Sequence, residues 1–435
     1  MGWLIKGGRV VDPANGLDCV ADVRIRDNRV VEVAPGLQRE VGERLIDAEG
    51  LVVAPGLVDM HAHFREPGHE EKEDIESGSR AAVMGGFTSV LCMANTDPVC
   101  DNASVVRYVL ERGREVGLCD VFPVGAVTKG LKGEEIAEMV DMARAGAVAF
   151  SDDGKPIASA SLMMKALQYS KITGKPIISH AEDPTLSQGT SMHYGSVSAR
   201  LGLRGVPAAG EESIVMRDVM LCKEVGGRLH LAHVSTRWSV VFLGWAKANG
   251  VSFTSEATPH HLALDHTYLL EHPYDTNAKV NPPLRTPEDR AELCKAVANG
   301  TIEVIATDHA PHHQDHKDVE FDLAAFGISG LETALPVCYT VLVEGMGMGL
   351  GELIRRMSLK PAEIVGLAPM GAGSLTPGAR ANIVVLDPNT ERQVDPSQFQ
   401  SKGQNSPFAG WKLRGWPVYT FYNGNMVMGE RRLLR

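Results

Sequence analysis

The sequence predicts an α/β fold: a (β/α)8 barrel with a small β domain formed by both termini. Three observations predict it. Short apolar runs alternate with helical patterns through the middle of the chain, both chain ends are rich in β-type residues, and polar residues follow one apolar run after another. Near-continuous apolar strands that alternate with helices form parallel sheets, and eight such units close a barrel.

The eight predicted strands share a short, β-rich apolar character. They are "LVVAPGLVDMH" (51–61), "FTSVLCMAN" (87–95), "DVFPVGAV" (120–127), "AVAFSDD" (147–153), "KPIISHAE" (175–182), "RLHLAHV" (228–234), "VSFTSEA" (251–257) and "EVIATDHA" (303–310). Stretches such as 133–146 and 161–174 between them have helix-like spacing. A doubly wound open sheet is the structural alternative. No GxGxxG follows a strand and no GxxxxGK[ST] occurs, so phosphate-loop folds have little support.

The two ends of the chain share a pattern of short strands and turns. Residues 1–50 and 379–435 contain alternating strands and Asn, Gly and Asp turns, which favour antiparallel pairs. Because chain ends often lie close together, we expect one composite β domain of residues 1–53 and 366–435. The barrel then takes residues 54–365.

Composition narrows the class of protein. The 435 residues carry a formal net charge of −11, which argues against nucleic acid or anionic lipid as a main partner. The seven cysteines include no CxxC pair, as is typical of a reduced protein. No signal-peptide pattern and no run of about 18 apolar residues occurs. We therefore expect a soluble, cytoplasmic protein.

Side chains of the kinds that bind metals lie at the C-terminal ends of several predicted strands. They are His61, His63, Asp153, His180, His233 and Asp308. The C-terminal strand ends of a barrel surround one pocket, and alternation along a strand points His61 and His63 the same way. Six such ligands fit two metal ions, with Asp153 as the natural bridge and zinc favoured by the imidazoles. Two cations would lower the pKa of a water and polarise a carbonyl.

Two further polar residues belong to the same region. Arg65 follows His63 by two residues and is suited to a bidentate contact with a substrate carboxylate, although a surface ion pair with Glu66 or Glu70 is the plainer interpretation. Asn95 could hold the same carboxylate or cap a turn.

The motifs together resemble those of the bacterial class I dihydroorotases of the amidohydrolase superfamily. They are "DMHAHFREPG", "MANTDP", "FSDDGKP", "ISHAED", "LAHVST", "ATPHHL", "KVNPPLR" and "IATDHAPH". The resemblance runs through the whole barrel and, more loosely, through both terminal segments. An HxH motif alone would indicate only the superfamily.

The resemblance implies a role for each matching residue. His61 and His63 would bind one metal with Asp308 nearby, His180 and His233 the second, and Asp153 would bridge them where many relatives use a carboxylated lysine. The implied substrate-binding residues are His63, Arg65, Asn95, Asn281, His312, Phe326 and Gly327. Of the four histidines in 309–320, an expected loop after the eighth strand, we assign a substrate role only to His312. We expect His260 and His261 to be structural or to support the ligands.

The implied activity is that of a dihydroorotase. It is the reversible cyclisation of N-carbamoyl-L-aspartate to L-dihydroorotate in pyrimidine biosynthesis, by metal-activated hydroxide with Asp308 as general acid and base. The implied cofactor is one or two Zn²⁺ per chain. The implied partners are the small-molecule substrate, a second copy of the chain in a dimer, and aspartate transcarbamoylase.

Two alternatives remain open from the sequence. Another cyclic amidohydrolase, such as a dihydropyrimidinase, hydantoinase or allantoinase, resembles this layout but usually carries the lysine bridge and lacks a dedicated arginine. A non-catalytic scaffold for aspartate transcarbamoylase is the second alternative, but such proteins typically lose metal ligands, and here all six are present.

Overall fold

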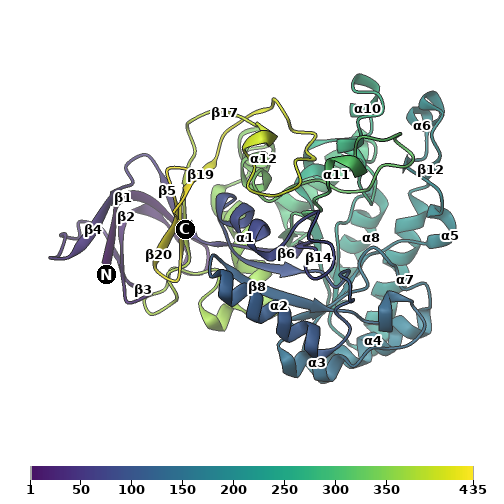
Figure 1. Cartoon of the computed structure of the whole chain (residues 1–435), viewed down its shortest axis with the longest axis horizontal. Helices are drawn as coiled ribbons and strands as arrows, with labels where there is room; N and C mark the ends of the chain where they lie inside the picture. Colours follow the sequence, from purple (N-terminus) through teal and green to yellow (C-terminus); the bar gives the residue numbers. More distant parts are fainter. Residues whose placement is uncertain (1, 435) are drawn as a thin grey trace.

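Two large sheets organise the chain in the computed structural model, which describes residues 2–434 (Figure 1). The larger unit is an eight-stranded parallel sheet in which every strand pairs with its neighbours in chain order. Its strands are β6 (Leu57–Ala62), β7 (Phe87–Cys92), β8 (Asp120–Gly125), β9 (Ala149–Phe150), β10 (Ile177–Ser179), β13 (Leu229–Leu231), β14 (Thr254–Ala257) and β15 (Val304–Ile305). Seven lie within the predicted runs and β6 ends one residue beyond the first run, at Ala62, so the predicted (β/α)8 architecture is confirmed.

The barrel closes between its first and last strands. The His63 N–H donates to the His309 carbonyl at 2.8 Å, next to an isolated bridge between Ala62 and His309. Asp59 completes the seam, because its carboxylate accepts from the Thr307 N–H at 2.9 Å and from the Thr307 hydroxyl at 2.5 Å. Burial raises the pKa of Asp59 to about 7, although the hydrogen bonds from Thr307 act to lower it. Asp59 therefore belongs to the closure of the barrel.

Helices follow the strands and cover the outside of the barrel. The seven crossover helices are α1 (Ile75–Met84), α2 (Ala103–Val116), α3 (Met139–Ala145), α4 (Ala160–Thr173), α7 (Ala209–Val225), α8 (Arg237–Ala248) and α11 (Pro287–Asn299). After β15 come α12 (Ala334–Cys338), π-helical turns at Tyr339–Glu344 and Arg355–Leu359, α13 (Leu350–Ile354) and α14 (Lys360–Val365). Across residues 2–434, none of the helices combines the length and apolar character needed to cross a membrane.

Shorter elements lie in the connecting loops. They are α5 (Pro184–Ser187), α6 (Ser196–Leu201), α9 (Pro259–Ala263), α10 (Tyr268–Glu271), the strand pairs β11 (Met192–His193) with β12 (Gly205–Val206) and β17 (Arg392–Gln393) with β18 (Lys412–Leu413), and 3-10 turns at Lys129–Leu131, Thr276–Ala278, Gln314–His316, Ala368–Met370 and Pro396–Gln398.

Local sequence signals explain where the helices begin. Asp74 caps α1, accepting a hydrogen bond from the Ser77 N–H while the Ser77 hydroxyl accepts one from the Asp74 N–H. Helix-like spacing predicted a helix over residues 133–146, but the observed helix α3 starts only at Met139. The residues before it form a turn in which Ile136 pairs with Thr128.

Both ends of the chain meet in the second sheet, as predicted. Its strands are β1 (Gly2–Asp12), β2 (Leu17–Arg26), β3 (Arg29–Ala34), β4 (Glu43–Asp47), β5 (Val52–Pro55), β16 (Ile383–Asp387), β19 (Trp416–Tyr422), β20 (Asn425–Gly429) and β21 (Arg432–Leu433). β5 joins the two ends, pairing parallel to β1 and antiparallel to β16. Figure 1 shows this sheet on the left, with both termini in it and the barrel beside it.

The C-terminal segment 388–415 leaves the small sheet and reaches over the barrel, as the yellow loops in Figure 1 show. Two buried glutamates attach it. Glu332 accepts from the Gln400 N–H at 2.6 Å, and Glu73 accepts from the Lys402 N–H at 3.2 Å and from the Ser401 hydroxyl. The segment is therefore part of the wall near the loop that follows β15.

Candidate active site

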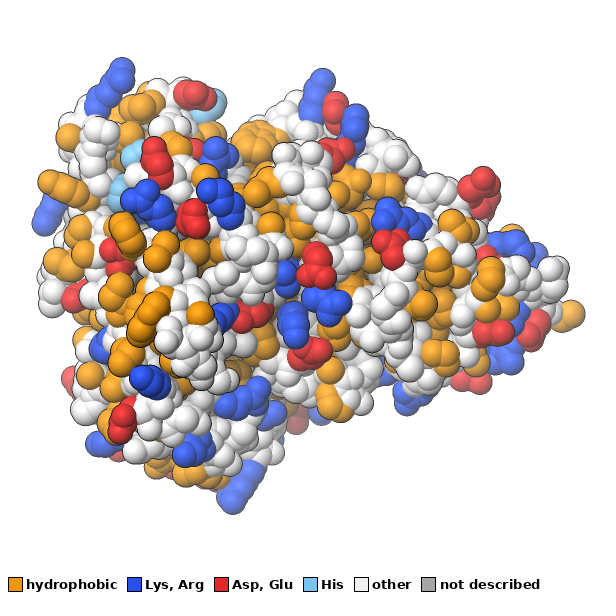
Figure 2. Space-filling model, turned by 180° about the vertical axis from the view of Figure 1, so that it is seen from behind, with side chains coloured by type: hydrophobic (Ala, Val, Ile, Leu, Met, Phe, Trp, Pro, Cys, Tyr) orange, Lys and Arg blue, Asp and Glu red, His pale blue; other side chains and the backbone are white. Residues whose placement is uncertain are grey.

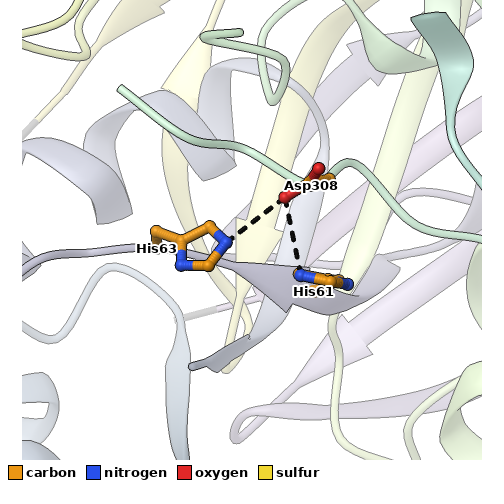
Figure 3. A group of neighbouring side chains, drawn as sticks. All are labelled: His61, His63 and Asp308. Carbon is orange, nitrogen blue, oxygen red and sulfur yellow. Dashed lines mark hydrogen bonds and ion pairs between the residues drawn. The ribbon is translucent and has the colours of Figure 1, made fainter. Parts of the chain in front are cut away.

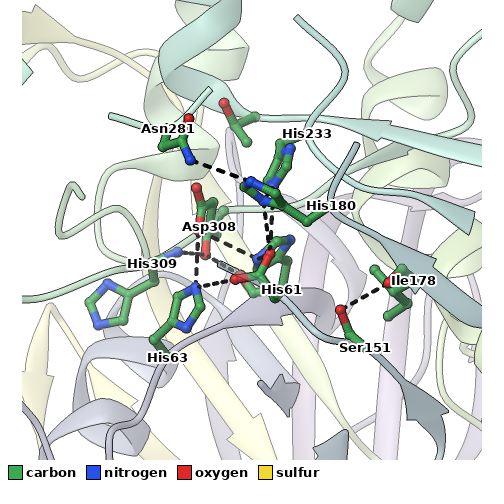
Figure 4. A network of polar contacts seen from close by, with 12 residues as sticks. His61, His63, Ser151, Ile178, His180, His233, Asn281, Asp308 and His309 are labelled. Atoms are coloured by element: carbon green, nitrogen blue, oxygen red, sulfur yellow. Dashed lines mark hydrogen bonds and ion pairs between the residues drawn. The ribbon is translucent and has the colours of Figure 1, made fainter. Parts of the chain in front are cut away.

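The six predicted ligands come together at the C-terminal ends of the barrel strands, and Figure 4 labels all of them except Asp153. Ligand atoms of His61, His63 and Asp308 lie within 4.8 Å of one another, as do those of His61, Asp153 and His233. Figure 3 shows the first group, in which Asp308 Oδ1 lies 3.2 Å from His63 Nε2 and 3.5 Å from His61 Nε2. All these side chains are buried.

Asp153 lies between the two groups. Its Oδ1 is 3.3 Å from His180 Nδ1, 3.4 Å from His61 Nε2 and 3.6 Å from His233 Nε2. Its Oδ2 is 3.4 Å from His63 Nε2. One carboxylate thus faces four imidazoles, which is the position expected of a bridging ligand. Lys155, the nearest lysine after it, is exposed in the following turn.

Hydrogen bonds on the outer nitrogens fix how three of these rings face inward. His61 Nδ1 lies 2.8 Å from Glu256, His63 Nδ1 lies 2.9 Å from Asn95 Oδ1, and His180 Nε2 lies 2.9 Å from Glu182. Each partner can accept a hydrogen bond from the outer nitrogen, so the inner nitrogen of each ring is directed toward the aspartates. Partners of this kind orient metal-ligating histidines.

The charges around the cluster keep both aspartates ionised. Burial alone would raise the pKa of each, but the surrounding imidazoles outweigh it and hold the pKa of Asp153 and of Asp308 well below the ordinary value. Likewise the Asp153 and Glu182 carboxylates overcome the effect of burial and raise the pKa of His180 to about 10. The cluster is a concentration of negative charge surrounded by nitrogen donors.

This donor set fits a divalent cation. His61 Nε2 and Asp153 Oδ1 are buried, face each other and lack a hydrogen-bond partner. Buried polar atoms without partners are rare, and a cation between them would satisfy both. Imidazole and carboxylate donors suit Zn²⁺ and similar metals.

A cavity of about 270 Å³ opens onto this cluster. It is lined by His63, Arg65, Asn95, Asp153, Gly154, His180, Asn281, Asp308, Ala310, His312, Phe326 and Gly327. All seven residues that the sequence assigned to substrate binding therefore line one cavity. Asn281 lies on its far side, where its amide donates to Glu182 at 2.6 Å.

Arg65 is the cationic side chain of this cavity. Its Nε is buried and lacks a hydrogen-bond partner. Burial lowers the pKa of Arg65 to about 10, against the attraction of Asp308 and Asp153, so the guanidinium is charged at neutral pH. The surface ion pair with Glu66 or Glu70 does not form. The geometry instead leaves donors for an anionic group in the cavity.

The loop after β15 supplies the opposite wall. His312 Nε2 donates to the Phe326 carbonyl at 2.8 Å, and burial, followed by the nearby charge of Arg65, lowers the pKa of His312 to about 2. The ring is therefore neutral, and its Nδ1 is a buried acceptor without a partner. Gly327 packs against Ala310 with φ of 142°, where a Cβ would lie 2.5 Å from the Ala310 carbonyl oxygen, so no larger residue fits.

Three site residues have a left-handed backbone. They are Arg65 (φ 63°), His233 (φ 32°) and Asp308 (φ 48°). Positive φ is unfavourable for residues with a Cβ, and such strain collects at functional sites where the surrounding structure holds it. These backbones turn the side chains inward just after their strands end.

The remaining predicted residues support the site from outside. Asp152 turns away from Asp153 and accepts from the Val127 and Thr128 amides at 2.8 and 3.0 Å. His309 lies 3.2 Å from Glu73. His260 and His261 lie on helix α9 rather than on a strand, and His261 contacts Thr258 and the Pro282 carbonyl.

Sequence reasoning missed two carboxylates. Glu256 on β14 contacts both His61 and His230, at 2.8 and 3.0 Å, and Glu182 orients His180. The signal available for Glu256 was its position near the C-terminal end of the seventh predicted strand, where the first, fourth, fifth, sixth and eighth strands carry the predicted metal ligands. Glu182 lies within the quoted motif "ISHAED".

The barrel and the histidine–aspartate cluster at its C-terminal rim define the class of protein: an enzyme of the amidohydrolase type. The family model described as Dihydro-orotase-like matches residues 50–239. A dihydroorotase of Pelotomaculum thermopropionicum is 49% identical over 99% of this chain and 99% of its own length, and one of Acetivibrio thermocellus is 46% identical over 99% and 100%. The chain belongs to the dihydroorotase family.

Solved structures agree on the fold. An L-hydantoinase (dihydropyrimidinase) from Arthrobacter aurescens superposes with a TM-score of 0.89 at 28% identity, covering 100% of this chain and 97% of its own. A dihydropyrimidinase from Brevibacillus agri gives a TM-score of 0.86 at 23% identity, covering 100% and 96%. The likeness to these structures extends over the barrel and the composite sheet together.

Proposed function

We propose that the chain catalyses the reversible cyclisation of N-carbamoyl-L-aspartate to L-dihydroorotate. The observation that carries this proposal is Arg65, a half-buried side chain whose Nε is buried and unpaired, in the same cavity as the histidine–aspartate cluster. N-carbamoyl-L-aspartate and L-dihydroorotate both carry a carboxylate that takes no part in the bond change. Family membership, with relatives 46–49% identical over nearly the whole chain, supports the same activity.

We further propose that the cation is Zn²⁺, one or two per chain. His61, His63 and Asp308 would hold one ion, His180 and His233 the second, and Asp153 would bridge them. Bound cations would lower the pKa of a water and polarise the reacting carbonyl. Glu256, Asn95 and Glu182 would keep the ligand nitrogens directed inward by the hydrogen bonds described above.

The remaining chemistry belongs to this chain's own side chains. Arg65 and Asn95 would bind the substrate carboxylate, and His312 would accept a hydrogen bond from the ring through Nδ1. In hydrolysis, water adds to the ring amide carbonyl, and Asp308 takes the proton and gives it to the departing ring nitrogen as the C–N bond breaks. In cyclisation the ureido nitrogen attacks the carboxyl carbon, and Asp308 accepts the proton from that nitrogen and gives it to the departing hydroxyl, so that the C–O bond breaks and water leaves.

A panel of ring substrates tests the proposed activity. We expect the purified protein to hydrolyse dihydroorotate and to turn over dihydrouracil, hydantoin and allantoin at least about a hundredfold more slowly, because these rings lack the carboxylate for Arg65. Initial rates for each compound under identical conditions measure this preference. Faster turnover of dihydrouracil or hydantoin would favour the other cyclic amidohydrolases.

Replacing the arginine tests its role directly. We expect Arg65→Met to lower kcat/KM for dihydroorotate by about 30- to 1000-fold, since removing one partner of a desolvated charge pair costs about 2–4 kcal/mol. Arg65→Lys keeps the charge but loses the bidentate geometry, so its kcat/KM should lie between the values of Arg65→Met and of the unchanged protein. Arg107→Met, on α2 and outside the cavity, is the control and should match the unchanged protein. An Arg65→Met enzyme with normal kcat/KM would remove the arginine from substrate binding.

We also propose a cytoplasmic location and a dimer, with aspartate transcarbamoylase as a further partner. Seven unpaired thiols, six of them buried, support a reducing compartment. Trp238 and Trp245 on α8 are more than half exposed, and apolar surface of this kind favours an association between chains. Figure 2 shows positive and negative side chains interspersed over one face, without the basic field that nucleic acid requires.

A further inference from the structure

The C-terminal segment places one buried side-chain amide behind the substrate loop. Asn405 is 4% exposed and lies between two stretches of that loop, one at 309–312 and the other at 327–329. These stretches pair with each other, since the Ala310 N–H donates to the Ile328 carbonyl at 2.9 Å. Asn405 comes from a different part of the fold, the excursion between β16 and β19.

Every polar atom of the Asn405 side chain is used. Its Oδ1 accepts from the His312 N–H at 3.0 Å and from the Ser329 hydroxyl at 2.9 Å. Its Nδ2 donates to the Ala310 carbonyl at 3.2 Å and to the Gly327 carbonyl at 2.9 Å. The Asn405 carbonyl also accepts from the Ser329 N–H at 2.8 Å. An asparagine can offer two acceptor sites and two hydrogens, and here all four are engaged.

These contacts reach the residues that face the substrate cavity. Ala310, His312 and Gly327 line that cavity, whereas Asn405 does not. Lys317 holds the same loop from within, donating to the Ala325 and Gly327 carbonyls at 2.8 and 3.0 Å. Of these two side chains, Asn405 is the one that bonds to both stretches at once.

We propose that Asn405 is a positioning residue for the substrate loop, which fixes the His312 ring and the Gly327 backbone at the distance from the cluster that dihydroorotate requires. The proposal rests on the proposed function. It extends the working site to the C-terminal segment, which supplies no side chain to the cavity itself.

Asn405→Asp is the sharpest test because it keeps the size of the side chain. Aspartate retains the acceptor for His312 and Ser329 but loses both hydrogens, and it sets an anionic oxygen against the Ala310 and Gly327 carbonyls. A buried acceptor facing an acceptor is unfavourable, so the loop must move. We expect KM for dihydroorotate to rise at least about tenfold while kcat stays within about threefold, since Asp308 and the metal ligands are untouched.

The control makes the same change one residue earlier. Gln404 is exposed, so Gln404→Glu adds the same charge and should leave KM and kcat unchanged. Asn405→Ala removes the hydrogen bonds without adding charge, and it replaces Asn405→Asp in the test if the aspartate variant does not fold. We expect a smaller rise in KM for Asn405→Ala than for Asn405→Asp. Normal KM in Asn405→Ala, or a fall in kcat with unchanged KM, would overturn the proposal.

Hydrogen exchange separates this proposal from the proposed function. We expect amides of 309–329 to exchange faster in Asn405→Asp than in the unchanged protein or in Gln404→Glu, with the barrel strands unaffected. This readout needs no turnover. A wild-type protein inactive on dihydroorotate refutes the function, whereas unchanged exchange at 309–329 refutes the role of Asn405.

Discussion

Asp308→Asn is expected to give a folded protein whose turnover of dihydroorotate falls by at least about a thousandfold. The amide has the shape of the carboxylate but cannot take a proton from the attacking water or return it to the ring nitrogen. Asparagine also tolerates the left-handed backbone at this position, where φ is 48°. The loss therefore reflects chemistry rather than misfolding. Steady-state kcat, thermal unfolding and metal content measured on the same preparation check this.

The matched control lies in the same loop. Asp315 is exposed and lies away from the cavity lining, so Asp315→Asn changes the charge equally and should keep normal kcat. Substantial turnover by Asp308→Asn would assign the proton transfer to another group.

Removal of bound metal by exhaustive chelation is expected to abolish turnover, and return of Zn²⁺ should restore it. Without a cation, His61 Nε2 and Asp153 Oδ1 keep no partner, and nothing lowers the pKa of the water. The melting temperature should fall as well, because a ligand that binds only the folded state stabilises it. Activity, metal per chain and thermal unfolding are followed through removal and return.

A chelator already saturated with zinc is the control and should have no effect on rate. Full turnover by a protein shown to be free of metal would exclude a metal from the reaction. If one equivalent of Zn²⁺ per chain restores full activity, one of the two ligand groups is sufficient for turnover.

The barrel was predictable because buried parallel strands have near-continuous apolar sequences, and each of the eight strands falls on such a run, with β6 ending one residue beyond its run. The inward direction of His61 and His63 followed from alternation along one strand. Their meeting with Asp308 followed from the closure of a barrel, which brings the first and eighth strands together. Recognised family motifs added the substrate residues, which the structure gathers in one cavity.

Features set by long-range packing were not predictable. Glu256 contacts His61 across the barrel, and no local pattern separates its carboxylate from a solvent-exposed one. Asn405 reaches His312 only because the C-terminal segment crosses to the barrel. The late start of α3 and the helix at His260 and His261 depend on surrounding contacts, which outweigh local propensity.

The pairing of β5 with β16 has a consequence for how the chain is made. Val53 pairs with Val385, so during synthesis on a ribosome the first strands emerge long before the strand that covers their edge. Until then the nascent sheet presents an open edge, which is a template for wrong pairing between chains. Strands made late in synthesis therefore complete a sheet whose other strands were made early.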